Sequence, residues 1–307
     1  MHSLIEMLKY RRPQGSKTQD KFCKRYLEPV FGKPDSHGNY ILHLGDSPIC
    51  FTAHHDTVHH KDGFQIVTVS GDIVTTSDKD SNCLGADCTT GIWLILGMIE
   101  AGVAGTYVIH AAEESGCIGS RALVDDSPLW LESIQAVISF DRMGQESIIT
   151  HQCGMRTASD AFAVSLSQAL CMPMLRPDPT GVYTDSESFA HIIPECTNIS
   201  VGYLAQHTKQ ESQDLFFADS LLESLIKAGW QALVIERDPA EYDNSEDSLY
   251  WSGFDRGVSR KGGDRLSELS NLCFDYPDEI AMILDSYGIT PYDLYQELDL
   301  NPAYLER

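Results

Sequence analysis

The chain lacks any run of 18 apolar residues, so no segment of its 307 residues predicts a membrane-spanning helix. A secretory signal is not indicated either, because the basic residues near the N-terminus follow the short apolar patch instead of preceding it. The nine cysteines are odd in number and irregularly spaced, which argues against a disulfide framework and favours a reducing, cytoplasmic location. No Cys-x-x-Cys pair is present to form a structural zinc knuckle.

Basic residues are also few. The chain has 22 of them against 45 acidic residues, a net charge of −23. Binding to nucleic acid needs a basic face, so this balance argues strongly against a nucleic-acid partner. It favours cationic groups, including free amino termini, although a charge that only keeps the protein in solution explains it equally well. The 42% hydrophobic content is ordinary for a globular protein.

From residue 40 onward, segments with the pattern of strands alternate with segments that have the pattern of helices. The predicted strands are Tyr40–Leu44, Ile49–Ala53, Thr106–Ala112, Ile134–Phe140 and Asn198–Tyr203, and a hairpin joins Phe64–Val69 to Asp72–Thr76. The predicted helices are Thr89–Ala101, Asp160–Leu170 and Asp214–Ile235. This order predicts an α/β fold, with a mixed, mostly parallel central sheet flanked by helices.

The last part of the chain has a different composition. Residues 238–307 contain 16 acidic and 5 basic residues, and Pro239–Gly263 is polar and broken. Two short helices are predicted after it, at Asp278–Tyr287 and Pro291–Leu298. We therefore expect one domain over residues 1–237 and an acidic helical extension over 238–307. The extension is either an element for homo-oligomerisation or a protein partner, or a tail without such a role.

Acidic residues and histidines follow the predicted strands at the points where those strands end. Loops at the carboxyl ends of parallel strands share one crevice, so we expect these side chains to converge. Each of them taken alone is more typical of a helix cap, a turn or a surface histidine, but their joint occurrence favours a site. The set consists of His54, Asp56, Asp87, Glu113, Glu114, Asp141 and His207.

Two histidines and three carboxylates suit a pair of divalent ions, and an odd carboxylate can bridge them. Neighbouring side chains diverge, so Glu113 and Glu114 cannot easily both bind metal. One should be a ligand and the other a general base that faces a metal-bound water. The metals would lower the pKa of that water and polarise the scissile carbonyl.

This pattern resembles that of the co-catalytic di-zinc aminopeptidases and of the related carboxypeptidases and deacylases. The matching positions are His54-x-Asp56, Gly85-Ala-Asp87, Glu113-Glu114, Asp141 and Gly202-Tyr-x-x-x-His207-Thr, and the likeness covers about residues 40–235. The resemblance implies two divalent ions, zinc in the first place. It also implies these roles: His54 and Asp141 on one ion, Glu114 and His207 on the other, Asp87 as the bridge, Glu113 as general base and Asp56 as the partner that orients His54.

Only 66 residues separate Asp141 from His207, too few for the lid domain that many deacylases of this group insert there. This favours the single-domain aminopeptidase branch. One departure is Cys88, at a position where the group often has a second acid. It is either a small buried residue or a thiol close to the metal.

We therefore expect a metallo-exopeptidase that hydrolyses N-terminal peptide bonds of a peptide or small amide substrate. One alternative is a carboxypeptidase or N-acyl amino acid hydrolase that reads a carboxylate through Arg142 or Arg156, although Arg142 fits a structural ion pair equally well. Another is an inactive binding module on the same fold. The segment Tyr183–Glu187 resembles a substrate-side segment, but its acids also fit a helix start. We expect His55, His59 and His60 to be loop residues outside the site.

Overall fold

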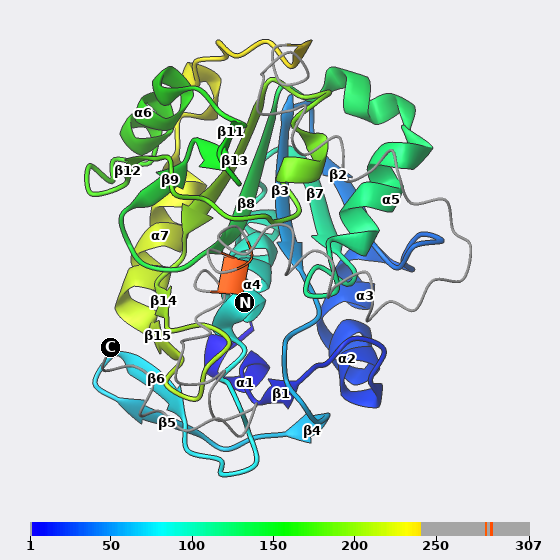
Figure 1. The fold of residues 1–307 in the computed structure, drawn as a ribbon, viewed down its shortest axis with the longest axis vertical. Coiled ribbons are helices and arrows are strands. Elements are labelled where there is room, and N and C mark those ends of the chain that lie inside the picture. The colour runs from blue at the N-terminus through cyan, green and yellow to red at the C-terminus, as the bar shows by residue number, and fades with distance from the viewer. Residues whose placement is uncertain (1, 241–279, 281–282, 285–307) are drawn as a thin grey trace. The chain divides into compact units, whose positions relative to one another are not determined.

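The computed structural model describes residues 2–240, 280, 283 and 284 of the chain (Figure 1). All of the elements given below belong to the first of two units, Met1–Leu249. The two helices expected at Asp278–Tyr287 and Pro291–Leu298 lie outside the described residues, apart from single positions. The domain boundary at residue 237 and the role of the acidic extension therefore stay predictions.

A sheet of seven strands is the largest in the described part of the chain, in the order β12-β9-β13-β8-β3-β7-β2 (Figure 1). Its strands are β2 (Tyr40–Leu44), β3 (Ile49–His54), β7 (Gly105–His110), β8 (Ala136–Arg142), β9 (Ser147–Ile149), β12 (Arg176–Asp178) and β13 (Glu195–Ser200). The four central strands β13, β8, β3 and β7 run parallel, whereas β2 is antiparallel to β7 and β9 to β13. The predicted fold class, a mixed and mostly parallel sheet, is confirmed.

The central strands are buried on both faces because their alternate side chains enter two different cores. On β3, Ile49 and Phe51 belong to the larger core and Cys50 to the smaller one. Phe51 stacks on Phe140 of β8, with ring centroids 5.9 Å apart. A continuous apolar run such as Ile49-Cys-Phe51 is therefore needed to bury a central strand.

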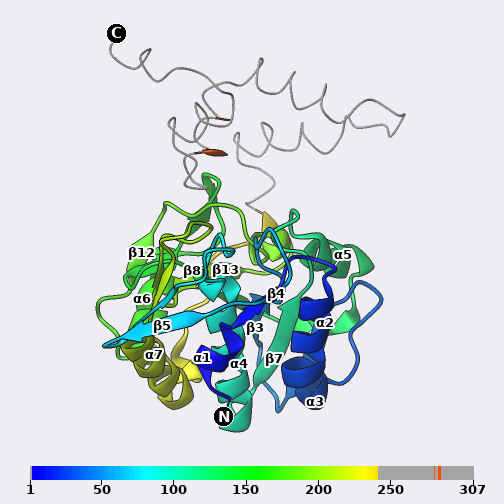
Figure 2. The same cartoon turned by 90° about the horizontal axis from the view of Figure 1, so that it is seen from below.

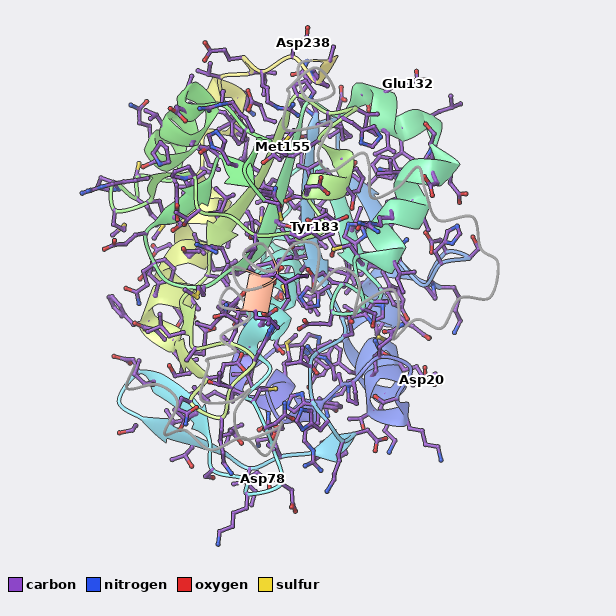
Figure 3. The ribbon with its side chains drawn as sticks, in the orientation of Figure 1. Asp20, Asp78, Glu132, Met155, Tyr183 and Asp238 are labelled. Carbon is purple, nitrogen blue, oxygen red and sulfur yellow. The ribbon has the colours of Figure 1, made fainter. Side chains whose placement is uncertain are left out.

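Helices cover both faces of this sheet. The larger core contains side chains of α4 (Ala86–Glu100), α6 (Asp160–Ala169) and α7 (Leu215–Lys227). The smaller core contains side chains of α5 (Ile118–Asp126), η2 (Leu129–Ser133) and η3 (Glu187–Phe189). No helix in the described residues is long and apolar enough to cross a membrane. Exposed acidic side chains, such as Asp20, Glu132 and Asp238, lie at the periphery of the view in Figure 3.

The N-terminal segment forms short elements beside the larger core: α1 (Leu4–Met7), β1 (Tyr10–Arg11), α2 (Lys17–Phe22), η1 (Cys23–Leu27) and α3 (Glu28–Phe31). Figure 2 shows α1 next to α4, which it contacts. β1 pairs with β4 (Gly63–Phe64). The predicted hairpin is present as β5 (Val67–Ser70) and β6 (Ile73–Thr76), and it continues into β15 (Ser212–Asp214) and β14 (Tyr203–Leu204). A further pair consists of β10 (His151–Gln152) and β11 (Met155–Arg156).

The main differences from the sequence prediction concern strand β13, the predicted long helix and helix α5. Strand β13 begins at Glu195 and ends at Ser200, earlier than expected, because the register shifts between Asn198 and Ser200 and Gly202 then turns with φ +93°. The predicted long helix ends at Lys227, and Trp230 of η4 (Trp230–Ala232) instead packs on Phe51. Helix α5 was not expected because it buries one large apolar side chain, Leu123, which leaves little helical pattern in the sequence.

Candidate metal centre

The predicted site residues come together at the carboxyl end of the central parallel strands. His54 is the last residue of β3, and Asp141 lies near the end of β8. Glu113 and Glu114 lie in the loop that follows β7, and Asp87 lies in the first turn of α4. His207 follows β14 and completes the group. The crevice rule for parallel strands thus places these side chains correctly.

The Asp87 carboxylate lies between the two histidines. Its Oδ1 is 3.0 Å from Nε2 of His54, and its Oδ2 is 3.1 Å from Nε2 of His207. On the His54 side, Oδ1 of Asp141 lies 3.3 Å from the same Nε2. On the His207 side, Oε2 of Glu114 lies 3.4 Å from that imidazole. Asp87 therefore joins two half-sites, each with one histidine and one further carboxylate.

Glu113 and Glu114 diverge, as expected for neighbours. Oε2 of Glu113 approaches His54 Nε2 only to 3.9 Å, and its Oε1 accepts a weak hydrogen bond from the Cys117 thiol at 3.7 Å. Glu114 points toward His207 instead. Glu113 thus lies at the edge of one half-site, while Glu114 belongs to the other.

Asp56 is fully buried and connects two parts of the site. Its Oδ1 lies 3.4 Å from Nδ1 of His54, the ring nitrogen that faces away from Asp87. Its two oxygens also accept the backbone N–H groups of Glu113 and Glu114, at 3.1 and 3.2 Å. One carboxylate therefore lies beside the His54 ring and holds the loop that carries the glutamate pair.

Burial and the negative charge of neighbouring groups shift the pKa values of three of these carboxyl groups upward. Burial, together with the charge of Asp87, raises the pKa of Glu114 to about 7, and burial also raises the pKa of Glu113 and Asp141. For His207, burial opposes the charged form, but hydrogen bonds with Asp87 and Glu114 raise its pKa to about 11. The carboxylates of the site therefore carry more negative charge than the two histidines can neutralise by binding protons.

Divalent cations fit this arrangement. Oε1 of Glu114 is buried without a hydrogen-bond partner. Ligand atoms of His54, Asp87 and Glu114 lie within 4.8 Å of one another, as do those of His54, Cys88 and Asp141. Imidazole nitrogens and carboxylate oxygens are the usual ligands of zinc in sites without a full cysteine set. The fit rests on the unpartnered oxygen, the donor types and the uncompensated charge.

Glu211 is a feature of the site that the sequence analysis missed. Its buried carboxylate accepts four backbone N–H groups, from Leu84, Gly85, Ala86 and Asp87, at distances from 2.8 to 3.1 Å. It therefore holds the first turn of α4, and with it Asp87, in place. Burial raises the pKa of Glu211 to about 7, and the backbone hydrogen bonds oppose this rise. Nothing in the local sequence Gln-Glu-Ser-Gln-Asp indicates this role.

His55 and His59 lie in a loop, outside the helices and strands, as expected, but both are buried. His55 Nδ1 hydrogen-bonds Gln19 at 2.9 Å, and His59 Nδ1 hydrogen-bonds Thr57 at 2.7 Å. Burial lowers the pKa of His59 to about 3, so its ring is neutral. They pack the loop behind the metal centre, whereas His60 is exposed.

The residues considered for substrate contacts have other partners. Nη2 of Arg142 donates to Thr180 and lies 3.6 Å from Asp178, as a structural ion pair would. Arg156 pairs with Asp160 on the surface at 3.0 Å.

The segment Tyr183–Glu187 reaches the metal centre from a loop. Thr184 donates a hydrogen bond to Oδ2 of Asp141 at 2.8 Å, and Asp185 is buried, with burial raising its pKa to about 8. Tyr183, labelled in Figure 3, accepts a hydrogen bond from Arg121 at 2.6 Å. Asp185 is therefore more than a solvated acid at a helix start.

Solved structures with the same fold include an aminopeptidase, a tripeptidase and a TET peptidase. An aminopeptidase PepT from Bacillus cereus has 15% identity and a TM-score of 0.55, over 73% of this chain and 96% of that one. A tripeptidase from Staphylococcus aureus has 13% identity and a TM-score of 0.58, over 73% and 95%. The TET1 peptidase of Pyrococcus horikoshii, which assembles into a tetrahedron or a large octahedral shell, has 16% identity and a TM-score of 0.53, over 75% and 99%. These likenesses show the fold.

A search of curated proteins finds no match. The family comparison does find one: residues 39–191 match Peptidase family M28. The matched segment contains the site residues from His54 to Asp185. His207 and Glu211 lie beyond its end. With the fold and the converging candidate ligand residues, this match identifies the chain as a metallopeptidase that is similar to peptidase family M28 over residues 39–191.

Proposed function

We propose that the protein is a di-zinc aminopeptidase, which hydrolyses the N-terminal peptide bond of a peptide or small amide substrate. The observation that carries the proposal is the Asp87 carboxylate, shared between His54 and His207 with 3.0 and 3.1 Å contacts. Asp141 beside His54 and Glu114 beside His207 add a second carboxylate to each half-site. Two half-sites with matching ligands suit the binding of two ions.

In the proposed site His54 and Asp141 would hold one ion, Glu114 and His207 would hold the other, and Asp87 would contribute to both. Bound zinc supplies a polarised substrate carbonyl and a water of lowered pKa. Glu113 removes the proton from the attacking water and passes it to the leaving amine. Burial raises the pKa of Glu113, which favours its taking up a proton from water. Asp56 keeps the His54 ring in its binding orientation.

The choice of aminopeptidase over a carboxylate-reading hydrolase rests on the charges around the site. The buried or nearly buried carboxyl groups there include those of Asp87, Glu113, Glu114 and Asp185. The arginines that would read a substrate carboxylate are engaged with Asp178 and Asp160. An ammonium group therefore fits this site better than a second carboxylate.

The test compares release of the first amino acid from a peptide with a free amino terminus and from the same peptide with an acetylated one. The zinc-loaded full chain should cleave the free peptide and leave the blocked one nearly intact. The Glu113→Gln variant, with its zinc content measured, is the control for catalysis by this site. Equal rates on the two peptides would contradict the aminopeptidase assignment, and activity that survives Glu113→Gln would contradict the site.

Location and assembly belong to the same proposal. A cytoplasmic location is supported by the odd, irregularly spaced cysteines. A homo-oligomer or a protein partner engaged by residues 238–307 is supported only by their acidic composition. Light scattering of the full chain tests whether the protein forms a homo-oligomer. A monomeric mass at all concentrations would argue against a homo-oligomer.

A further inference from the structure

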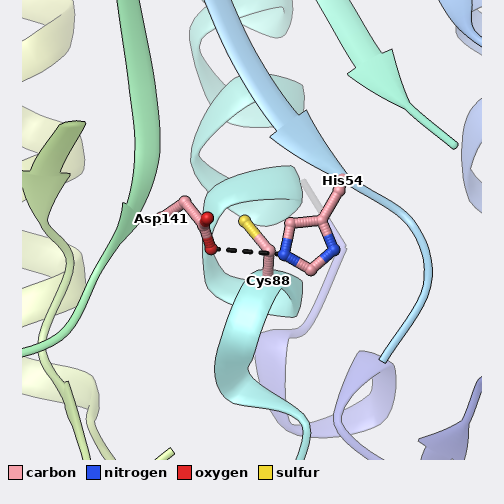
Figure 4. A group of neighbouring side chains, drawn as sticks. All are labelled: His54, Cys88 and Asp141. Carbon is pink, nitrogen blue, oxygen red and sulfur yellow. Dashed lines mark ion pairs between the residues drawn. The ribbon is translucent and has the colours of Figure 1, made fainter. Parts of the chain in front are cut away.

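Cys88 lies directly beside the His54 half-site and has no part in the proposed mechanism. Its Sγ, an imidazole nitrogen of His54 and a carboxylate oxygen of Asp141 all lie within 4.8 Å of one another. Figure 4 shows the sulfur between the two other side chains, below the end of β3. The residue is fully buried. Three groups of metal-binding type from three elements therefore face one point.

The structure around Cys88 holds the sulfur at this point. Cys88 has φ −110° and ψ 40°, outside the helical region, at the start of α4. A Cβ atom built on Gly91 would lie 2.6 Å from the sulfur and 2.2 Å from the Phe140 carbonyl oxygen. Only glycine at position 91 therefore lets α4 approach β8 so closely. The close approach places the thiol, which belongs to the larger core, next to Asp141.

We propose that Cys88 is a ligand of the cation at the His54 and Asp141 half-site, an inference that rests on the proposed metal centre. Thiolate is a soft ligand, so this half-site would prefer thiophilic cations such as Zn²⁺ or Cd²⁺ over Mn²⁺. The other half-site offers only nitrogen and oxygen ligands, from Glu114, His207 and Asp87. The two half-sites would then differ in metal preference within one chain.

Coordination would change the present hydrogen bond of the thiol. Sγ now donates to the Phe140 carbonyl oxygen at 3.1 Å. On metal binding the S–H bond breaks, its proton goes to solvent, and the sulfur electron pair forms the bond to the cation. The alternative is a purely structural thiol, which keeps its proton and its hydrogen bond to Phe140.

Cobalt(II) substitution distinguishes the two, because a thiolate bound to Co²⁺ gives an intense near-ultraviolet charge-transfer band that nitrogen and oxygen ligands do not give. We expect this band in the full chain loaded with Co²⁺, and its loss in Cys88→Ser and Cys88→Ala. Cys50→Ser is the matched control, since Cys50 is equally buried but faces the smaller core. It should keep the band.

Competition between Cd²⁺ and Mn²⁺ provides a second readout. At one of the two sites, the ratio of Cd²⁺ affinity to Mn²⁺ affinity should fall in Cys88→Ser. We expect a fall of at least roughly 10-fold, the cost of losing even an outer partner of a metal ligand. Two bound Co²⁺ ions without the band, or an unchanged preference in Cys88→Ser, would overturn the Cys88 assignment and leave the metal centre standing. No bound Co²⁺ at all would overturn both, so metal analysis tells the two failures apart.

Discussion

Replacing Glu211 with glutamine should weaken the metal centre from a distance, because the Glu211 carboxylate holds the start of α4, which carries Asp87. Each oxygen of its carboxylate accepts two backbone N–H groups: Oε2 from Leu84 and Gly85, and Oε1 from Ala86 and Asp87. A glutamine keeps one of these oxygens. Its NH₂ group replaces the other, so two buried N–H groups lose their acceptor and face a donor instead.

The size of the effect follows from those two lost hydrogen bonds. A hydrogen bond to a charged group contributes about 1.5–3 kcal/mol, so Glu211→Gln should lower the free energy of unfolding by about 3–6 kcal/mol. In a domain of this size that corresponds to a Tm lower by roughly 6 to 24 °C. Measurements at pH 8 are appropriate, because burial raises the pKa of Glu211 to about 7 and the carboxylate must be ionised.

A second buried carboxylate in this chain provides the matched control. Glu195 accepts hydrogen bonds from the backbone N–H groups of Ser159, Glu236 and Arg237 and from the Ser159 hydroxyl. It is the first residue of β13 and therefore lies at the end of that strand away from the site. Glu195→Gln should lower Tm by a comparable amount. Only Glu211→Gln should also weaken zinc binding, because only Glu211 fixes Asp87.

The assay measures Tm by calorimetry and zinc affinity by competition with a chromophoric chelator, for both variants and the unchanged chain. If Glu211→Gln binds zinc as tightly as Glu195→Gln does, Glu211 does not position Asp87 and the reasoning fails. If neither variant loses stability, the hydrogen bonds of these carboxylates do not contribute as argued.

Three further predictions concern the metal centre itself. Glu113→Gln should reduce turnover by about 10²–10⁴-fold while the zinc content, measured by mass spectrometry, stays unchanged; zinc loss would instead make Glu113 a ligand. Asp56→Asn should weaken zinc binding by about 10–100-fold, since His54 loses its orienting partner, and an unchanged affinity in a chelator competition would refute this role. In the zinc-free protein, burial raises the pKa of Glu114 to about 7 and that of Asp185 to about 8, so the folded state holds protons that the unfolded state has lost. Its stability in urea should therefore fall as the pH rises from about 4.5 to 8, and zinc should reduce this loss; a rise over that range would contradict the burial of these groups.

The sequence is informative where a function depends on a local pattern. The apolar run Ile49–Ala53 followed by His54 and Asp56 indicates both a buried strand and polar groups at its end, and β3 has these bounds to within one residue. The same reasoning places Glu113 after β7 and Asp141 near the end of β8. It is less reliable for β13 and α7, where a register shift and the packing of Trp230 move the element ends.

The sequence by itself determined the fold class and the set of residues that meet at the metal centre, because strand ends and the chemistry of metal ligands are both readable along the chain. Only the tertiary structure decided how Asp87 is held. Its four-bond support comes from Glu211, 124 residues further along the chain, and hydrogen bonds between such distant residues leave no periodic trace. The burial of His55 and His59, and the position of the Cys88 sulfur beside His54 and Asp141, were decided in the same way, by which surfaces pack together.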